Sequence, residues 1–161
     1  METRAKYAGP AEISWDGVAG APFGVMYSLD VPSRVALVRE GAPADLLVTI
    51  AQQMGIAREP LYRALGLAPS TIKRKIQGHL TLAADESEIA LGIARLIGQV
   101  ETMVAESSDT TDFDSAKWLG RWLERPNPAL GGARPVDYLD TADGRQMVSE
   151  LLARMVSGAY S

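Results

Sequence analysis

The sequence predicts an all-α protein, and two observations carry this prediction. Beyond residue 33, apolar residues recur at the three- and four-residue spacing of amphipathic helices, and glycine or proline stands near the ends of these stretches. No segment of this part alternates apolar and polar residues with the period of two that a half-buried strand requires. We therefore expect a set of helices joined by short turns and loops.

Residues 1–33 are predicted to form an N-terminal arm that is partly flexible. The segment is rich in glycine, alanine and proline and shows no helical period, although Trp15, Phe23 and Tyr27 are many aromatic residues for a disordered tail. Two interpretations stay open. The segment is either a flexible arm or a part that orders on a partner or on a second copy, with a short strand at residues 25–29.

Residues 34–108 are predicted to form a helix-turn-helix domain for DNA binding and dimerisation. The apolar face of its first helix, which Gly55 ends, consists of Leu46, Leu47, Ile50, Ala51 and Met54. Two short helices follow in AREPLYRALG and LAPSTIKRKIQG, and a tight turn at Gly66 joins them. We expect Ser70 to cap the second of these helices and Gly78 to end it.

A longer helix is expected over residues 85–105. Asp85 and Glu88 have the spacing of a capping box at its start. The apolar residues that keep the helical period are Ile89, Ile93, Leu96, Ile97, Val100 and Val104. The polar run ESSDTTD then breaks the pattern, so we place a domain boundary there.

Residues 109–161 are predicted to form a second, small helical domain. Asp114 is placed to cap a helix that runs through Glu124, and Phe113 is placed to pack on Trp118 as a hydrophobic staple. The stretch RPNPALGGARPVDYL follows. Its three prolines remove backbone donors and its two adjacent glycines give access to positive φ, which predicts a shaped loop that changes the chain direction.

Two further helices are expected after this loop. Pro135 is well placed to begin a short one over residues 136–139. Thr141 then caps the last helix, which Gly158 ends. The apolar face of this last helix consists of Met147, Val148, Leu151, Leu152 and Met155.

Composition excludes several classes of protein. The formal net charge of −4 and the pI near 5.0 argue against a protein that coats nucleic acid or an acidic membrane through charge alone. The absence of cysteine excludes disulfides, thiolate metal sites and a cysteine nucleophile. No run of eighteen apolar residues occurs, so we expect a soluble cytoplasmic protein without a membrane partner.

The positive charge is concentrated in the pair of short helices. Residues 56–79 hold five basic residues and one acidic residue, and each of the flanking segments has an acidic excess. Ile72 and Ile76 are expected to face the core, whereas another face presents the side chains of a recognition helix. The predicted DNA-binding residues are Ser70, Lys73, Arg74, Lys75 and Gln77, with Arg74 and Gln77 for base edges and Lys75 for phosphate. A solvated basic stripe is the alternative.

The sequence offers little support for catalysis. Ser70 and Lys73 have the S-x-x-K spacing, but no K-T-G partner occurs. His79 has no carboxylate partner nearby in the sequence, which favours a turn or surface histidine over a metal ligand or proton relay. The acids Asp109, Asp112 and Asp114 fit a solvated linker and a helix cap. We therefore expect no enzyme, no catalytic residue, no metal site and no cofactor.

The C-terminal third resembles the toxin-binding domain of the Xre/MbcA/ParS antitoxin family. That family's pattern is W-L-x-x-P-N-x-A-L-G-G-x-x-P, then a short apolar helix, then T-x-x-G, and finally a helix that ends in G-x-Y. The matching residues are Trp122, Leu123, Pro126, Asn127, Ala129, Leu130, Gly131, Gly132, Pro135, Leu139, Thr141, Gly144, Gly158 and Tyr160. The stretch GLAPSTIKRKI is also similar to the Xre-type helix-turn-helix of this family.

The resemblance implies a type II antitoxin whose toxin has a RES domain, a fold related to ADP-ribosyltransferases that attacks NAD⁺. It implies that the antitoxin's C-terminal end closes the toxin's active site and that its N-terminal half dimerises and binds the operon's promoter. The toxin-binding residues expected here are Arg154, Gly158, Ala159, Tyr160 and Ser161. The expected partners are the RES-domain toxin, operator DNA, a second copy of the chain and a larger toxin–antitoxin hetero-oligomer.

One alternative belongs to another class of protein. A DNA-binding regulator with a C-terminal oligomerisation or effector domain, and with no toxin partner, also accounts for the helix-turn-helix pattern. An operon without a RES-domain reading frame, together with retained promoter binding, would favour it. The shaped loop at residues 125–139 has a role in the antitoxin interpretation, since it sets the angle at which the last helix reaches the toxin.

Overall fold

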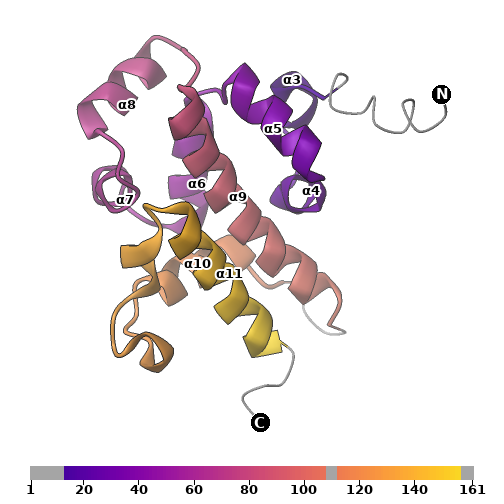
Figure 1. The fold of residues 1–161 in the computed structure, drawn as a ribbon, viewed down its shortest axis with the longest axis vertical. Helices are drawn as coiled ribbons and strands as arrows, with labels where there is room; N and C mark the ends of the chain where they lie inside the picture. Colours follow the sequence, from indigo (N-terminus) through magenta and orange to yellow (C-terminus); the bar gives the residue numbers. More distant parts are fainter. Residues whose placement is uncertain (1–12, 108–111, 157–161) are drawn as a thin grey trace, which may run out of the picture.

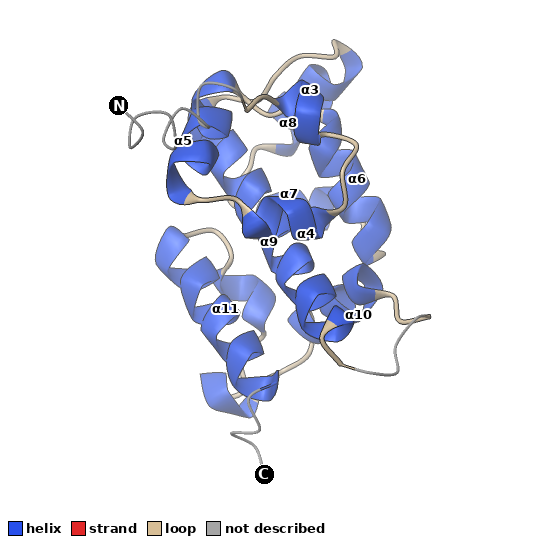
Figure 2. Cartoon of the chain, turned by 90° about the vertical axis from the view of Figure 1, so that its right-hand side faces the viewer, coloured by secondary structure: helices blue, strands red, loops and turns tan. Residues whose placement is uncertain are grey.

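The structure is a computed structural model of the 161-residue chain, and it describes residues 13–107 and 112–156. Helices joined by short loops make up these described ranges, which contain no strand (Figures 1 and 2). In chain order they are α3 (Trp15–Val18), α4 (Phe23–Ser28), α5 (Val31–Glu40), α6 (Asp45–Met54), α7 (Arg58–Ala64), α8 (Pro69–Gln77), α9 (Ala84–Ala105), α10 (Ser115–Leu123), the 3-10 turns η1 (Pro128–Leu130) and η2 (Pro135–Tyr138), and α11 (Ala142–Val156). The predicted all-α class is confirmed.

Helix α9 is the central element of the fold. It has 22 residues, and α4, α5, α6, α10 and α11 all pack against it (Figure 1). Its side chains are therefore buried around most of the helix and not only along one stripe. Helix α4 comes especially close at Gly98, where a Cβ atom would lie 2.1 Å from the carbonyl oxygen of Phe23.

The expectation of a helix-free arm with a strand at residues 25–29 is wrong. The chain forms α3 and α4 there, and Trp15, Phe23 and Met26 are buried in the core. The indole Nε1 of Trp15 donates to the carbonyl oxygen of Leu37 at 2.8 Å, which ties α3 to α5. These helices have four and six residues, too few for a hydrophobic period to appear, and their stability comes from tertiary packing. Residues 1–12 lie outside the described part.

The helices predicted over residues 45–105 are confirmed, but two of their expected N-terminal caps are wrong. Ser70 is not a cap, because Pro69 already occupies the first position of α8 and Ala68 precedes it. The expected end of α8 at Gly78 is confirmed, since Gly78 is the C-cap, and His79 after it adopts the left-handed φ of 52°.

The predicted capping box at the start of α9 is also wrong. The helix begins one residue before Asp85, and the N-cap position is held by Ala83. The carboxylate of Glu86, not that of Glu88, accepts the backbone N–H of Ala83 at 2.8 Å. The alanine side chain has no oxygen to complete the reciprocal half of the box, so a single carboxylate satisfies this helix end.

The predicted starts of the C-terminal helices are confirmed, and the predicted end of the last helix at Gly158 lies outside the described residues. The carboxylate of Asp114 accepts the N–H of Lys117 at 3.1 Å, and the rings of Phe113 and Trp118 lie 6.2 Å apart, as a staple requires. At the start of α11, Thr141 Oγ1 accepts the N–H of Gly144 at 2.9 Å. The short helix expected after the loop is the 3-10 turn η2, with a proline at its first position.

Candidate functional site

The exposed face of α8 is the first candidate site. Ile72 is fully buried beneath the helix, and the side chains of Ser70, Lys73, Arg74 and Gln77 are all exposed. These four residues lie on one helical face because their spacing is three or four residues. Arginine and glutamine match the donor and acceptor patterns of base edges, and lysine suits phosphate. The arrangement is that of a recognition helix.

The turn between α7 and α8 fixes the direction of this face. Gly66 adopts φ 75°, and the N–H of Leu67 donates to the carbonyl oxygen of Tyr62 at 2.8 Å. The N–H of Gly66 also donates to the carbonyl oxygen of Arg63 at 3.0 Å. The two bonds form a Schellman motif, and the side chain of Leu67 is buried. The helix pair is thus held in the geometry of a helix-turn-helix.

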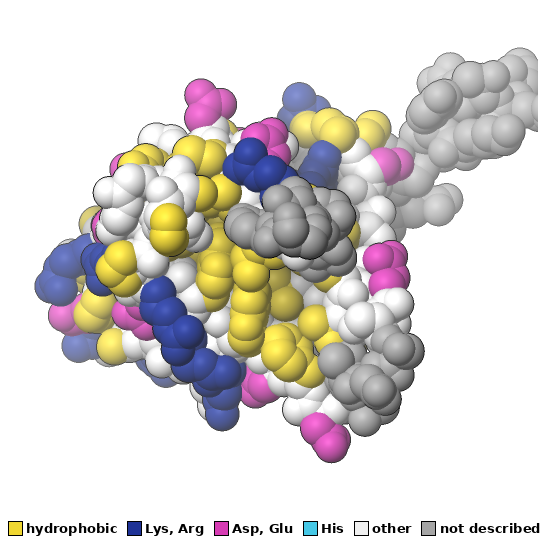
Figure 3. Space-filling model, turned by 90° about the horizontal axis from the view of Figure 1, so that it is seen from below, with side chains coloured by type: hydrophobic (Ala, Val, Ile, Leu, Met, Phe, Trp, Pro, Cys, Tyr) yellow, Lys and Arg dark blue, Asp and Glu magenta, His cyan; other side chains and the backbone are white. Residues whose placement is uncertain are grey.

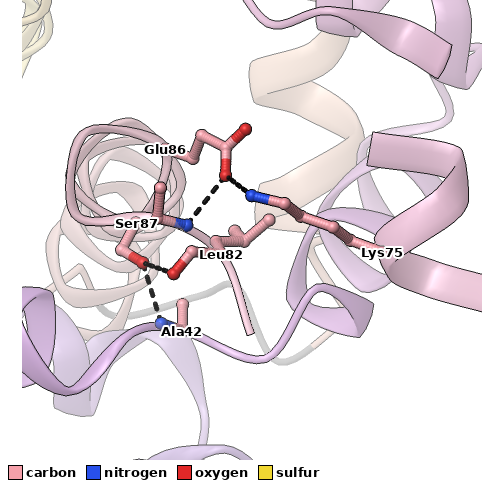
Figure 4. A network of polar contacts seen from close by, with 6 residues as sticks. Ala42, Lys75, Leu82, Glu86 and Ser87 are labelled. Atoms are coloured by element: carbon pink, nitrogen blue, oxygen red, sulfur yellow. Dashed lines mark hydrogen bonds and ion pairs between the residues drawn. The ribbon is translucent and has the colours of Figure 1, made fainter. Parts of the chain in front are cut away.

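Lys75 differs from the other predicted DNA-binding residues. Its ammonium group forms an ion pair with the carboxylate of Glu86 (Figure 4), and the two side chains are only 16% and 14% exposed. The positive charge is therefore already partnered inside the chain, and the side chain ties α8 to the start of α9. The structure thus gives Lys75 a different role from the phosphate contact that the sequence predicts.

A second hydrogen-bond pair supports the same end of α9. Ser87 Oγ accepts the backbone N–H of Ala42 at 2.8 Å and donates to the carbonyl oxygen of Leu82 at 3.3 Å (Figure 4). Ser87 is completely buried, so both bonds are shielded from water. The loop before α6, the segment after α8 and the start of α9 are consequently joined at one point behind the recognition helix.

The second candidate site is α11, the last described helix. Arg145 on its second turn is buried against α9, and its Nη1 donates to the carbonyl oxygen of Leu139 at 2.9 Å. Its Nη2 lies 3.7 Å from a carboxylate oxygen of Glu88 on α9. Burial lowers the pKa of Arg145, and the negative charges of Glu88 and Asp140 oppose that shift. One side chain therefore joins η2, α9 and α11.

A reciprocal amide–serine contact fixes α11 further along. Gln99 Nε2 donates to the carbonyl oxygen of Ser149 at 3.0 Å, and Ser149 Oγ donates to Gln99 Oε1 at 2.8 Å. Gln99 is 4% exposed, so each bond prevents a buried polar atom from remaining unsatisfied. Apolar contacts complete the attachment, since Val148, Leu151 and Leu152 are all buried.

The start of α11 lies extremely close to η2. A Cβ atom at Gly144 would lie 1.7 Å from the carbonyl oxygen of Tyr138, a distance that no side chain permits. Before η2, the loop closes on itself: the N–H of Asn127 donates to the carbonyl oxygen of Ala133, and its side chain accepts the N–H of Ala129, both at 2.9 Å. The loop therefore sets the direction in which α11 leaves the body.

The end of the molecule at which α11 finishes is partly apolar. Seen from below, hydrophobic side chains gather in the middle of this view and lysine and arginine side chains flank them (Figure 3). In the C-terminal domain, Phe113 and Met155 are exposed, and the half-buried Trp118 and Trp122 stack with ring centroids 6.1 Å apart.

The predicted toxin-binding residues fall into two groups. Arg154 is exposed on the last turn of α11. Gly158, Ala159, Tyr160 and Ser161 lie outside the described residues. Sequence reasoning did not identify Arg145, Gln99 or Ser149 as the residues that position α11. A glutamine within the apolar period of α9 is the one signal that pointed to a buried partner.

Residues 13–107 and 112–156 show neither a metal site nor a membrane span. No group of three or more histidine, aspartate or glutamate side chains is placed there to hold a metal ion. No helix in these ranges has both the length and the hydropathy that crossing a bilayer requires.

Comparisons with known proteins match two parts of the chain to antitoxin domains. Residues 33–95 match the antitoxin Xre-like helix-turn-helix domain, and residues 112–158 match the antitoxin Xre/MbcA/ParS C-terminal toxin-binding domain. The first match spans most of α5, then α6 to α8 and about the first half of α9. The second spans α10, the closed loop and α11.

Three relatives cover most of the chain. A protein of Sphingobium sp. (strain YBL2) named Prs ADP-ribosylating antitoxin is 37% identical over 136 residues, which are 84% of this chain and 86% of the relative. Proteins named antitoxin Xre are 28% identical in Photorhabdus laumondii (81% of this chain, 82% of the relative) and 26% identical in Pseudomonas putida (75% and 69%). The chain therefore belongs to the Xre/MbcA/ParS family of antitoxins, with a helix-turn-helix domain followed by a toxin-binding domain.

Proposed function

We propose that this antitoxin neutralises a RES-domain toxin by closing its active site and represses its own operon through α8. The C-terminal end enters the toxin's active-site cleft and excludes NAD⁺, with contacts from Arg154 and from Gly158, Ala159, Tyr160 and Ser161. The N-terminal half forms a homodimer, which a larger toxin–antitoxin assembly contains, and the complex works in the cytoplasm without a cofactor. The chain itself catalyses no reaction.

The observation that carries the toxin-binding part is the rigid attachment of α11. The guanidinium of Arg145, the Gln99–Ser149 contact and the close approach at Gly144 all hold this helix from its first turns onward. A plug inserted into a cleft binds more tightly when its support is already ordered, because less conformational freedom is lost on binding. The exposed apolar side chains beside α11 supply a docking surface around the plug.

The first experiment measures NAD⁺ and growth in cells that express the toxin gene with either the full antitoxin or a chain cut after Val156. We expect the full chain to protect and the shortened chain to co-purify with the toxin without protecting. A matched control keeps the length but replaces residues 157–161 with glycine and serine. Equal protection by all three chains would show that neutralisation comes from the docked helices, and the occlusion mechanism would then be wrong.

The DNA-binding part rests on the exposed side chains of α8. The double variant K73E/R74E reverses two charges on that face, and we expect it to lose promoter binding in a gel shift while it still rescues growth. The control variant K117E/R121E makes the same change of net charge on exposed residues of α10 and should bind the promoter as the natural chain does. Equal loss in both variants would mean that net charge, and not this face, governs binding.

A further inference from the structure

A groove of about 570 Å³ lies between α5, α9 and α11, away from the exposed face of α8. Its walls combine two kinds of side chain. Aliphatic residues, among them Val35, Leu91 and Leu96, line it together with Tyr27 of α4, and four arginines also face it. These arginines are Arg34, Arg39, Arg95 and Arg145. The volume is within the range of about 300–1,000 Å³ that small-molecule sites occupy.

The positive charge of the groove exceeds its negative charge. Glu88 is the acidic residue of its lining, and it already lies against Arg145. Within the described ranges, no carboxylate comes within ion-pair distance of Arg34, Arg39 or Arg95. Asp30 lies near enough to Arg34 for their charges to interact, but its carboxylate caps α5 through the N–H of Ser33. The overall charge of the chain is −4, so this local excess is not a general property of the surface.

Arg95 is the least satisfied of these cations. Its Nε is buried, and it has no hydrogen-bond partner in the described part of the chain. Burial and the neighbouring charge of Arg34 both lower the pKa of Arg95, whereas Tyr27 acts in the opposite direction. A buried guanidinium donor without an acceptor costs free energy that a bound anion would remove. An anion beside Arg95 would therefore supply the acceptor that its Nε lacks.

The charge and the shape together define the ligand. Several guanidinium groups around one groove suit an anion with two or more charges, and arginine binds phosphate through paired N–H donors. Inorganic phosphate alone would leave most of the volume and the aliphatic wall without contacts. We propose that this groove binds a small organic phosphate of nucleotide size, with its phosphates on Arg34 and Arg95 and its organic part against Val35 and Leu91.

Such a ligand would connect the two halves of the antitoxin. Arg34 and Val35 belong to α5 within the helix-turn-helix match, and Ala142, Gln146 and Ser149 of α11 line the opposite wall. A molecule held by both walls stabilises the attachment of α11 to the DNA-binding half. The inference goes beyond the proposed function and does not depend on the identity of the toxin.

Isothermal titration of the full chain with ADP, pyrophosphate and citrate tests the proposal. We expect saturable binding of ADP, weaker binding of pyrophosphate and none of citrate at the same ionic strength. Arg34→Gln and Arg95→Gln should each weaken ADP binding at least tenfold. Arg121→Gln, which removes an exposed arginine on α10, is the matched control and should bind ADP as the natural chain does.

A second variant tests the apolar wall. Val35→Asn should weaken the binding of ADP and leave that of pyrophosphate unchanged, because only the organic part contacts this side chain. Arg34 is only partly buried, so its variant remains informative even if the Arg95 variant unfolds. Three outcomes would each overturn the proposal: no saturable ADP binding at millimolar concentration, an ADP affinity in both arginine variants equal to that of the natural chain, or binding of citrate as tight as that of ADP.

Discussion

Helices α8 and α11 carry the two candidate sites, and the protein holds them in different ways. Helix α8 lies on the body through the buried Ile72 and the Lys75–Glu86 ion pair, and most of its surface faces solvent. Helix α11 is embedded along its length by apolar packing, by Arg145 and by the Gln99–Ser149 contact. The candidate site on α8 therefore consists of side chains that the helix exposes, whereas α11 is fixed by the contacts of its buried face.

The largest effect should come from the close approach at α11. Gly144→Ala places a Cβ atom where the carbonyl oxygen of Tyr138 lies, so α11 must move. We expect a loss of about 3 kcal/mol in the free energy of unfolding and loss of toxin neutralisation, with promoter binding retained in the folded fraction. Urea unfolding followed by circular dichroism measures the first effect, and growth rescue measures the second.

The matched control for this variant is Gly17→Ala in α3. No atom lies within 4 Å of a Cβ atom at that position, so alanine should be neutral or should stabilise the chain by up to about 1 kcal/mol through its helix propensity. An equal loss of stability in both variants would show that the effect is one of glycine content and not of the contact between α11 and η2.

The second prediction concerns the tether of α8. Lys75→Met should cost about 1–2 kcal/mol, since it leaves the largely buried carboxylate of Glu86 without its cation. A double-mutant cycle with Glu86→Gln should give a coupling energy of similar size. The expected loss in the free energy of unfolding is smaller for Lys75→Met than for Gly144→Ala because α8 can readjust toward solvent, whereas α11 cannot.

The same variant tests whether Lys75 contacts DNA. In promoter titrations at several salt concentrations, Lys73→Met should lower the slope of log K against log salt by about one, as loss of a phosphate contact does. Lys75→Met should leave the slope unchanged, because its charge is already paired within the chain. A lower slope in the Lys75 variant would restore the phosphate contact that the sequence predicts.

The long helices were predictable from the sequence because their apolar period extends over three or more turns. The exposed face of α8 was predictable because its residues are only three or four positions apart in the sequence. The N-terminal caps of helices were predicted less well: a proline at the first position of α8 displaced the cap from Ser70, and α9 begins one residue before the predicted Asp85, with Ala83 at the N-cap position.

The contacts that attach α11 to the rest of the protein could not be predicted from the sequence. Gln99 and Ser149 are 50 residues apart, and nothing local indicates that their side chains meet. Arg145 looks like a surface residue of an amphipathic helix until the fold places Leu139 and Glu88 beside it. Helices α3 and α4 were missed for a related reason, since only their packing on other helices stabilises them.

The third prediction separates polar satisfaction from apolar packing in α11. Ser149→Ala removes the donor to Gln99 Oε1 and leaves a buried acceptor without a partner, which should cost about 1–2 kcal/mol. The double variant Gln99→Leu/Ser149→Ala removes both polar groups, so it should be more stable than Ser149→Ala alone. Additive losses in urea unfolding would mean that the contact contributes packing only.

The smallest effect should appear at the end of α8. His79 adopts φ 52°, a left-handed conformation that costs a residue with a side chain about 1 kcal/mol and that glycine adopts readily. Relief of this strain should raise the free energy of unfolding of His79→Gly by about 0.5–1 kcal/mol. The greater conformational entropy of glycine in the unfolded chain reduces this gain.

His79→Ala separates the backbone effect from the loss of the imidazole. Both variants remove the exposed contact of His79 Nδ1 with Asp45 at 3.9 Å, which is worth little in water. Alanine keeps the backbone strain and glycine relieves it, so the two unfolding free energies should differ in favour of glycine. If alanine stabilises as much as glycine, the gain does not come from the left-handed turn, and α8 ends without the strain that its backbone indicates. A gain with glycine alone would show that α8 loses some stability to backbone strain at its end, whereas α11 is held by contacts from Gly144 to Leu152.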